Sequence, residues 1–126
     1  MQHPQSNKQI VTDFLTLVTT GKTIEAYEKY IDMSGKHHNT FNPAGFVALQ
    51  QGMLENDAVA PHKQFTIKHI LADGDLVTTH AHLQFNPGEP GMVVFHMFRI
   101  SDGKIVEMRD CGQPIPADSP NTDGAF

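Results

Sequence analysis

The side chains best suited to proton-transfer chemistry are His96 and Asp110, which lie in the segment 92–113. Two runs of alternating apolar and polar residues flank Ser101-Asp102-Gly103 there, and this pattern predicts a β-hairpin. A two-residue loop would pair even-numbered residues of one strand with odd-numbered residues of the other, whereas a three-residue loop places His96 and Asp110 side by side. We favour the three-residue loop because it groups the apolar side chains, with Asp110 as the only charged group among them.

Such a pair could act as a general base beside a hydrogen-bond donor. A carboxylate on an apolar surface needs a partner, and a desolvated carboxylate can remove a proton next to a carbonyl group. The imidazole of His96 could hold Asp110 ionised or polarise a substrate oxygen. The alternatives are a salt bridge from Asp110 to a basic residue and a core histidine that bonds to a neighbouring acceptor.

Further histidines raise the question of a metal. His80 and His82 are two residues apart, so a strand projects both to one face. If the loop 86–91 is centred near Gly88, His80 lies opposite His96 and joins the same cavity; the preceding turn leaves this open. Three imidazoles and Asp110 could bind zinc or non-haem iron. His-x-His alone is a weak ligand spacing, so we predict neither a metal nor a cofactor, and a metal-dependent enzyme remains an alternative.

The composition excludes several classes of partner. The formal net charge is −5, and the nine lysines and arginines are scattered singly. Nucleic acid and membrane surfaces are therefore not expected partners. No apolar run approaches the ~20 residues that span a bilayer. The single cysteine, Cys111, excludes an intrachain disulfide and fits a reducing compartment, and we expect a cytoplasmic protein.

The elements that must position these side chains follow from periodicity and capping signals. Ser6 and Gln9 resemble a capping box for a helix that ends by Gly21, and Thr23 can cap a second helix. Asn42-Pro43 is expected to start a third helix that runs to about Asn56. The remaining expectations are a loop or short edge strand over 32–41, strands over 63–71, 76–85 and the two arms of the hairpin, and buried stripes formed by Ile24, Tyr27, Tyr30 and Ile31 and by Phe46, Leu49 and Met53.

This order of elements predicts an α+β fold. Three N-terminal helices pack on a curved, mainly antiparallel sheet of four to six strands and form a cone-like barrel with an apolar cavity. Residues 1–113 make the single domain, and 114–126 form a proline-containing tail without regular secondary structure.

Several strings are similar to those of a known family. They are His37-His38-Asn39 with Asn42-Pro43, Asp73-Gly74-Asp75-Leu76-Val77, Phe98-Arg99-Ile100 with the segment 102–107, and Arg109-Asp110 followed by Gln113. Together with the order of elements, they resemble the SnoaL-like polyketide cyclases of the nuclear-transport-factor-2-like superfamily, which includes ketosteroid isomerase. Arg109 stands where members usually have tryptophan.

The resemblance implies roles for individual residues. Asp110 would be the acid/base of an intramolecular aldol closure, His38 would point into the pocket, and His96 would donate a hydrogen bond to an enolate oxygen. It also implies a cone-like α+β barrel, a homodimer and a small apolar or carbonyl-containing substrate, for a cyclase or isomerase; a non-catalytic small-ligand-binding protein of this fold is the alternative. The expected substrate-binding residues are His80, Asn39, Phe41, Phe46, Phe98, Met108 and Tyr30.

Overall fold

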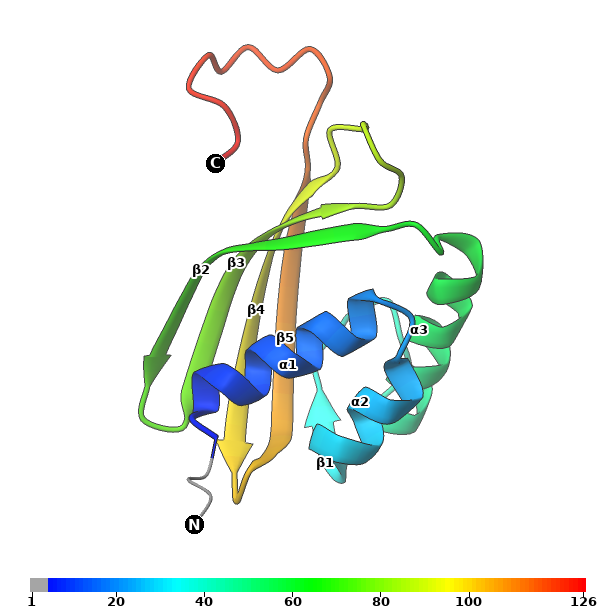
Figure 1. The fold of residues 1–126 in the computed structure, drawn as a ribbon, viewed down its shortest axis with the longest axis vertical. Coiled ribbons are helices and arrows are strands. Elements are labelled where there is room, and N and C mark those ends of the chain that lie inside the picture. The colour runs from blue at the N-terminus through cyan, green and yellow to red at the C-terminus, as the bar shows by residue number, and fades with distance from the viewer. Residues whose placement is uncertain (1–4) are drawn as a thin grey trace.

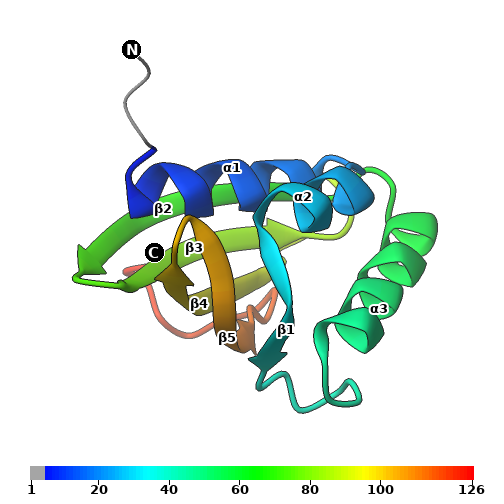
Figure 2. The same ribbon diagram turned by 90° about the horizontal axis from the view of Figure 1, so that it is seen from below.

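The computed structural model describes residues 5–126, in which three helices lie against a curved five-stranded sheet (Figure 1, Figure 2). The strand order is β1-β5-β4-β3-β2; β1 and β5 are parallel, and the other neighbours are antiparallel. The predicted α+β class is confirmed. The elements are α1 (Asn7–Thr19), α2 (Thr23–Tyr30), β1 (Ile31–His37), α3 (Phe46–Val59), β2 (Gln64–Asp73), β3 (Leu76–Gln84), β4 (Met92–Ser101) and β5 (Lys104–Pro114).

The hydrophobic core lies between the helices and the sheet face that they cover, which we call the inner face. Phe14 of α1 is at its centre, with ring centroids 5.8 Å from Tyr27 and 5.9 Å from Phe98. Tyr27 in turn meets Phe46 of α3 edge-on. The core therefore joins all three helices to β4. Its other buried members include Ile10, Val11, Leu15, Val18, Ala26, Tyr30, Ile31, Leu49, Val77, Ile100, Ile105 and Met108.

The first helix begins as predicted, whereas the next two differ in detail. The Ser6 hydroxyl accepts from the Gln9 N–H, and the Gln9 side chain accepts from the Ser6 N–H, which makes the predicted capping box. Thr23 does not cap α2; it is the first helical residue, and its hydroxyl bonds to Asp57. Ile24 was expected in the buried stripe but is 55% exposed.

The third helix begins at Phe46, three residues later than the predicted first helical residue, Pro43. Its N-cap is Gly45, whose φ of 93° is accessible to glycine at little cost. Asn42, the predicted N-cap, instead donates its side-chain amide to Asn39. The segment 32–41 supplies the edge strand β1, which pairs in parallel with β5.

The predicted three-residue turn of the last hairpin is wrong. Ser101 pairs with Lys104, so Asp102 and Gly103 form a two-residue loop. Their φ values of 50° and 75° are those of a type I′ turn, which favours glycine at the second position and follows the twist of antiparallel strands.

A β-bulge next to this turn restores the even-to-even alignment that the longer loop would have given, with the pairing shifted by two residues. Arg99 pairs with Glu107 although Ile100 pairs with Ile105, so Val106 is the extra residue. Beyond the bulge, even-numbered residues of β4 lie opposite even-numbered residues of β5. The sheet consequently pairs His96 with Asp110 and places both on one face, as expected from the sequence, although the three-residue loop would have paired His96 with Met108.

Residues 115–126 contain neither helix nor strand. They turn back beneath the sheet, on the side opposite α1 and α2, which we call the outer face (Figure 2). The ring of Phe126 lies 4.7 Å from His82 and 5.5 Å from His80, centroid to centroid. The segment therefore covers part of the outer face of its own sheet. No helix within residues 5–126 has both the length and the apolar character needed to cross a bilayer.

Candidate active site

His96 and Asp110 both line a cavity of about 280 Å³ on the inner side of the sheet. They are direct partners on β4 and β5, so their side chains point to the same face. A larger depression of about 620 Å³ lies between α1 and β2, but no carboxylate or imidazole lines it. The smaller cavity is thus the candidate site. Its remaining walls are Phe14, Leu15, Val18, Asn39, Asn42, Leu49, Gly52, Met53, Asn56, Leu83, Phe85 and Met108.

Asn39 holds the Asp110 carboxylate. Its Nδ2 donates to both carboxylate oxygens, at 3.1 and 2.9 Å. Its Oδ1 accepts from the Phe41 N–H at 3.0 Å and from Asn42 Nδ2 at 2.8 Å. Because two donors require an oxygen there, the amide orientation is fixed and Nδ2 must face Asp110. Asn39, which was expected to bind substrate, lines the cavity and also orients the carboxylate.

His96 is enclosed by aromatic rings at the base of the cavity. It stacks on Phe98 with centroids 5.5 Å apart and meets Phe65 edge-on at 6.2 Å. Burial lowers the pKa of His96 below its ordinary value of 6.5, and the nearby Asp110 charge opposes this shift only in part. The imidazole is therefore neutral at pH 7 and still carries one N–H donor.

Two buried polar atoms beside the cavity lack a hydrogen-bond partner within residues 5–126. They are His96 Nδ1 and the hydroxyl of Thr79, which is the β3 partner of His96. Buried polar groups are nearly always paired, so an orphan pair of this kind is typical of a ligand-binding region. Sequence reasoning missed Thr79. The signal was present, because Val77, Thr79 and Ala81 form the buried stripe of β3.

His38 does not enter the cavity, which corrects the role that the resemblance implied. Its Nε2 lies 2.7 Å from the Glu107 carboxylate, on an exposed part of the surface. His37 is the buried member of the pair: its Nε2 bonds to the Pro43 carbonyl, and its Nδ1 accepts from the Asn39 N–H. With Nδ1 as the acceptor, Nε2 is the protonated nitrogen. His37 therefore fixes the loop that carries Asn39.

His80 also lies outside the cavity, because the predicted centre of the β3–β4 loop was wrong by half a residue. Leu83 pairs with Met92, so His80 falls opposite Phe95, and Thr79 falls opposite His96. A register change of one residue moves a side chain to the other face. On the outer face, His80 Nδ1 lies 2.9 Å from His69 Nδ1, and the ring stacks on Phe95.

The hypothesis of a metal bound by the histidine cluster does not fit this geometry. His80 and His82 lie on the outer face with Phe126, whereas His96 and Asp110 lie on the inner face. The sheet separates the supposed ligands. Within the described part of the chain, no group of three or more His, Cys, Asp or Glu side chains is placed to hold a metal ion.

The predicted apolar walls are placed as follows. Met108 lines the cavity. Phe46 and Phe98 are completely buried in the core rather than lining the cavity, and Phe41 is 93% exposed. Tyr30 donates to the Asp13 carboxylate and lies near Gln5 instead of reaching the cavity. Leu83 and Phe85, at or just after the end of β3, line the cavity in place of the predicted aromatic residues.

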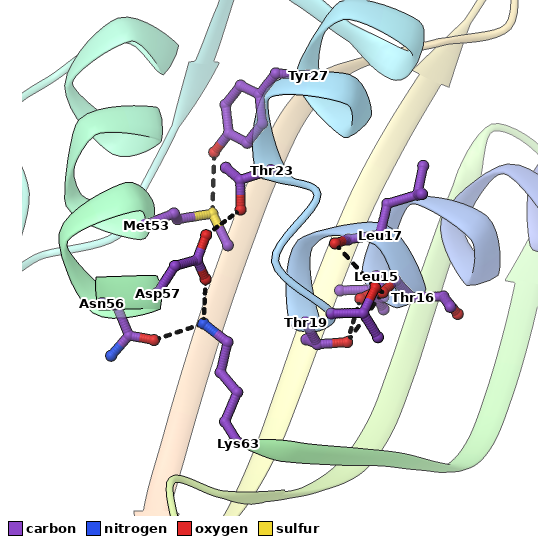
Figure 3. A network of polar contacts seen from close by, with 11 residues as sticks. Leu15, Thr16, Leu17, Thr19, Thr23, Tyr27, Met53, Asn56, Asp57 and Lys63 are labelled. Carbon is purple, nitrogen blue, oxygen red and sulfur yellow. Dashed lines mark hydrogen bonds and ion pairs between the residues drawn. The ribbon is translucent and has the colours of Figure 1, made fainter. Parts of the chain in front are cut away.

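The cavity-facing stripe of α3 combines Leu49 and Met53, which were predicted, with Gly52 and Asn56, which were not. Leu49, Gly52, Met53 and Asn56 recur at helical spacing and all line the cavity. A Cβ atom on Gly52 would come within 2.5 Å of Asn42 Oδ1, so this glycine lets Asn42 lie against the helix. At the end of the stripe, Asn56 joins a network with Asp57, Lys63 and Thr23 (Figure 3).

The family follows from comparison with known proteins. The model of the SnoaL-like domain matches residues 11–108. The chain belongs to the SnoaL-like domain family. The predicted resemblance is confirmed, although no curated protein matches the chain.

Solved structures share the SnoaL-like fold at low sequence identity. An NTF2-like protein of unknown function from Cytophaga hutchinsonii has a TM-score of 0.72 and 11% identity, covering 90% of this chain and 96% of its own. IdmH, a proposed polyketide cyclase from Streptomyces antibioticus, has a TM-score of 0.71 and 19% identity, covering 86% and 93%. A proposed SnoaL-like polyketide cyclase from Shewanella putrefaciens has a TM-score of 0.70 and 14% identity, covering 88% and 81%. These matches confirm the cone-like α+β fold.

Proposed function

We propose that this SnoaL-like protein catalyses proton transfer at a carbon next to a carbonyl group, as a cofactor-independent cyclase or isomerase. The observation that carries the proposal is the pairing of His96 with Asp110 at one apolar cavity. Family membership and the similarity to proposed polyketide cyclases support it. The substrate would be a small, largely apolar carbonyl compound, because a 280 Å³ cavity is near the lower end of small-molecule sites.

Asp110 is the general base in this mechanism. Its carboxylate removes a proton from the carbon next to the carbonyl group, and the electron pair of that C–H bond forms an enolate. Two lone pairs are used by Asn39 Nδ2, which leaves others on the carboxylate free to accept the proton. The bidentate contact holds Asp110 in one orientation, and a fixed base is more effective than a mobile one. The same carboxylic acid then returns the proton to another carbon or to an oxygen.

His96 stabilises the charge that develops on the carbonyl oxygen. A neutral imidazole keeps an N–H donor, and a donor in a dry site stabilises an oxyanion more strongly than it would in water. The burial that lowers the pKa of His96 also ensures that it does not simply neutralise Asp110 as a permanent ion pair.

The first test is hydrogen exchange in 2-tetralone, a bicyclic ketone with acidic hydrogens next to its carbonyl group. In D₂O, the wild-type protein should accelerate loss of these NMR signals above the buffer rate. Asp110→Asn should reduce the acceleration by about 10²–10⁴-fold, since it removes the base. Asp118→Asn, an exposed carboxylate of the C-terminal segment, is the matched control and should retain full activity. Exchange at the wild-type rate in Asp110→Asn would contradict the role of Asp110 as the base, whereas no acceleration by the wild-type protein would favour a non-catalytic binder.

We also propose that the protein functions as a homodimer through the outer face. Phe95 and Met97 are 50% and 39% exposed there. Large apolar side chains gathered on one exposed face are typical of an interaction surface. Because this face lies behind the sheet from the cavity, dimer formation would leave access to the site open.

A further inference from the structure

The amide of Asn56 is locked in one orientation at the edge of the cavity. Lys63 Nζ donates to Asn56 Oδ1 at 2.8 Å (Figure 3). An ammonium group has only donors, so a flipped amide would set NH₂ against NH₃⁺. Nδ2 therefore points away from Lys63, as Figure 3 shows, and it has no hydrogen-bond partner among residues 5–126. Asn56 lines the cavity, and its Nδ2 carries two unused N–H donors while Oδ1 is turned toward Lys63.

The orientation of the Asn56 amide is well fixed because the Lys63 side chain is itself held in place. Its side chain is only 7% exposed, and its Nζ lies 2.5 Å from Asp57 Oδ1. The other oxygen of Asp57 accepts from the Thr23 hydroxyl at 2.7 Å. Residues of α2 and α3 thus form one network with Lys63, which directly precedes β2. A donor that is fixed before binding loses little conformational entropy when a ligand accepts from it.

Asn56 and Asp110 stand at opposite ends of the site. Asn42 lies against Gly52 and donates to Asn39, and Asn39 donates to Asp110. Gly52 is therefore the residue of α3 that this chain of contacts connects to Asp110. Asn56 is four residues further along, a rise of about 6 Å.

The space between the two ends is apolar. Met53 lies within the interval along α3, and Leu83 and Phe85 face it from the end of β3. Gln64 pairs with Gln84, so the backbone of Lys63 lies near Phe85, and the Lys63 side chain extends from there to Asn56. The cavity therefore has an acid–base end, an apolar middle and an end at which Asn56 Nδ2 supplies hydrogen-bond donors.

We infer that Asn56 is a specificity-determining residue that donates a hydrogen bond to a second oxygen of the substrate. The ligand class is a compact apolar molecule, one or two rings in size, with oxygen acceptors at both ends. The oxygen at the Asp110 end is the reacting carbonyl, and this assignment rests on the proposed function. The oxygen at the Asn56 end is an acceptor such as a ketone or ester carbonyl.

Binding of two rigid ligands tests the inference. 2-Decalone has one carbonyl group, and decalin-2,6-dione has a second one at the opposite end that can only accept hydrogen bonds. The ratio of their Kd values, measured by calorimetry, isolates the second carbonyl. Asn56→Asp keeps an oxygen for Lys63 but replaces the free NH₂ by a second acceptor. We expect this variant to shift the ratio against the dione by about 3- to 10-fold relative to wild type, the value of one hydrogen bond.

Two further variants make the result unambiguous. Asn56→Leu should shift the ratio in the same direction, whereas Gln51→Leu, an exposed amide on the same helix, should leave it at the wild-type value. An unchanged ratio in folded Asn56→Asp would overturn the inference. Asp110→Asn should retain the wild-type ratio while losing hydrogen exchange, so a failure of the proposed catalysis is distinguishable from a failure of this subsite.

Discussion

At the scale of single residues, the most informative side chain is a histidine that the fold keeps neutral. His96 lies against Phe98 and Phe65, and burial lowers its pKa from 6.5. A protonated imidazole there would lose its hydration and gain only the Asp110 charge in return. The neutral imidazole of His96 can donate a hydrogen bond to an oxyanion, but its burial also makes the folded protein less stable at low pH.

This predicts a specific pH dependence of stability. Below about pH 6.5 the unfolded chain protonates this histidine and the folded chain resists doing so. The unfolded state then binds more protons, so the free energy of unfolding falls as the pH falls. His96→Gln should remove this contribution, which is at most about 1.4 kcal/mol per pH unit for one group. Urea unfolding between pH 7.5 and 5 measures it, and equal slopes in both proteins would contradict the burial argument.

At the scale of elements, the site depends on how α3 meets the loop before it. Gly52 lies in the middle of a helix, where glycine costs up to about 1 kcal/mol relative to alanine. The compensation is the close approach of Asn42, which a Cβ atom would block. Asn42 then orients Asn39, and Asn39 orients Asp110.

Gly52→Ala should therefore separate stability from activity. The helix gains propensity, so the free energy of unfolding should change little or rise, while Asn42 is displaced and Asp110 loses its fixed orientation. We expect hydrogen exchange in 2-tetralone to slow by about 10- to 100-fold. Val47→Ala, at an exposed position of the same helix, is the control. Full activity in Gly52→Ala would show that the Asn42 contact does not position the base.

The network around Lys63 supports a second prediction at this scale. Lys63→Met removes the cation that joins α2, α3 and β2 and leaves the Asp57 carboxylate, only 17% exposed, without its charge partner. Removing one member of such a pair costs about 3 kcal/mol in unfolding free energy. Lys29→Met breaks the exposed pair with Asp13 and should have a far smaller effect. Guanidinium unfolding compares the two, and similar losses would contradict the role of burial.

The elements also show what the sequence could and could not predict. Local signals such as the Ser6 capping box and the alternation of β4 were sufficient for the existence of the helices and of the hairpin and for the shared face of His96 and Asp110. The strand register was not predictable. Neither the bulge at Val106 nor the exact centre of the β3–β4 loop, which decides the face of His80, changes the alternating pattern of the sequence. The contact of Asn39 with Asp110 spans 71 residues and depends on the parallel edge strand, which only the folded sheet reveals.

At the scale of the whole molecule, the sheet divides the chemistry between two faces. The inner face holds the cavity, while the outer face carries exposed Phe95 and Met97 beside His80, His82 and Phe126. The segment 115–126 covers only part of this surface (Figure 2). Exposure of these apolar side chains to water is unfavourable, and burial in a second copy would relieve it.

This arrangement predicts that Phe95→Asp separates a dimer into monomers. In the dimer, each subunit would bury one such carboxylate in the interface without a positively charged partner, which is costly. We expect the dimer dissociation constant, measured by sedimentation equilibrium, to rise by about 100-fold or more. Val47→Asp, which is 70% exposed on α3 and far from this face, should remain dimeric. Because Phe95 points away from the cavity, monomers of Phe95→Asp should keep the Kd ratio that Asn56 sets. A wild-type protein that sediments as a monomer would contradict the proposed interface, whereas a change in that ratio would mean that the two faces are coupled.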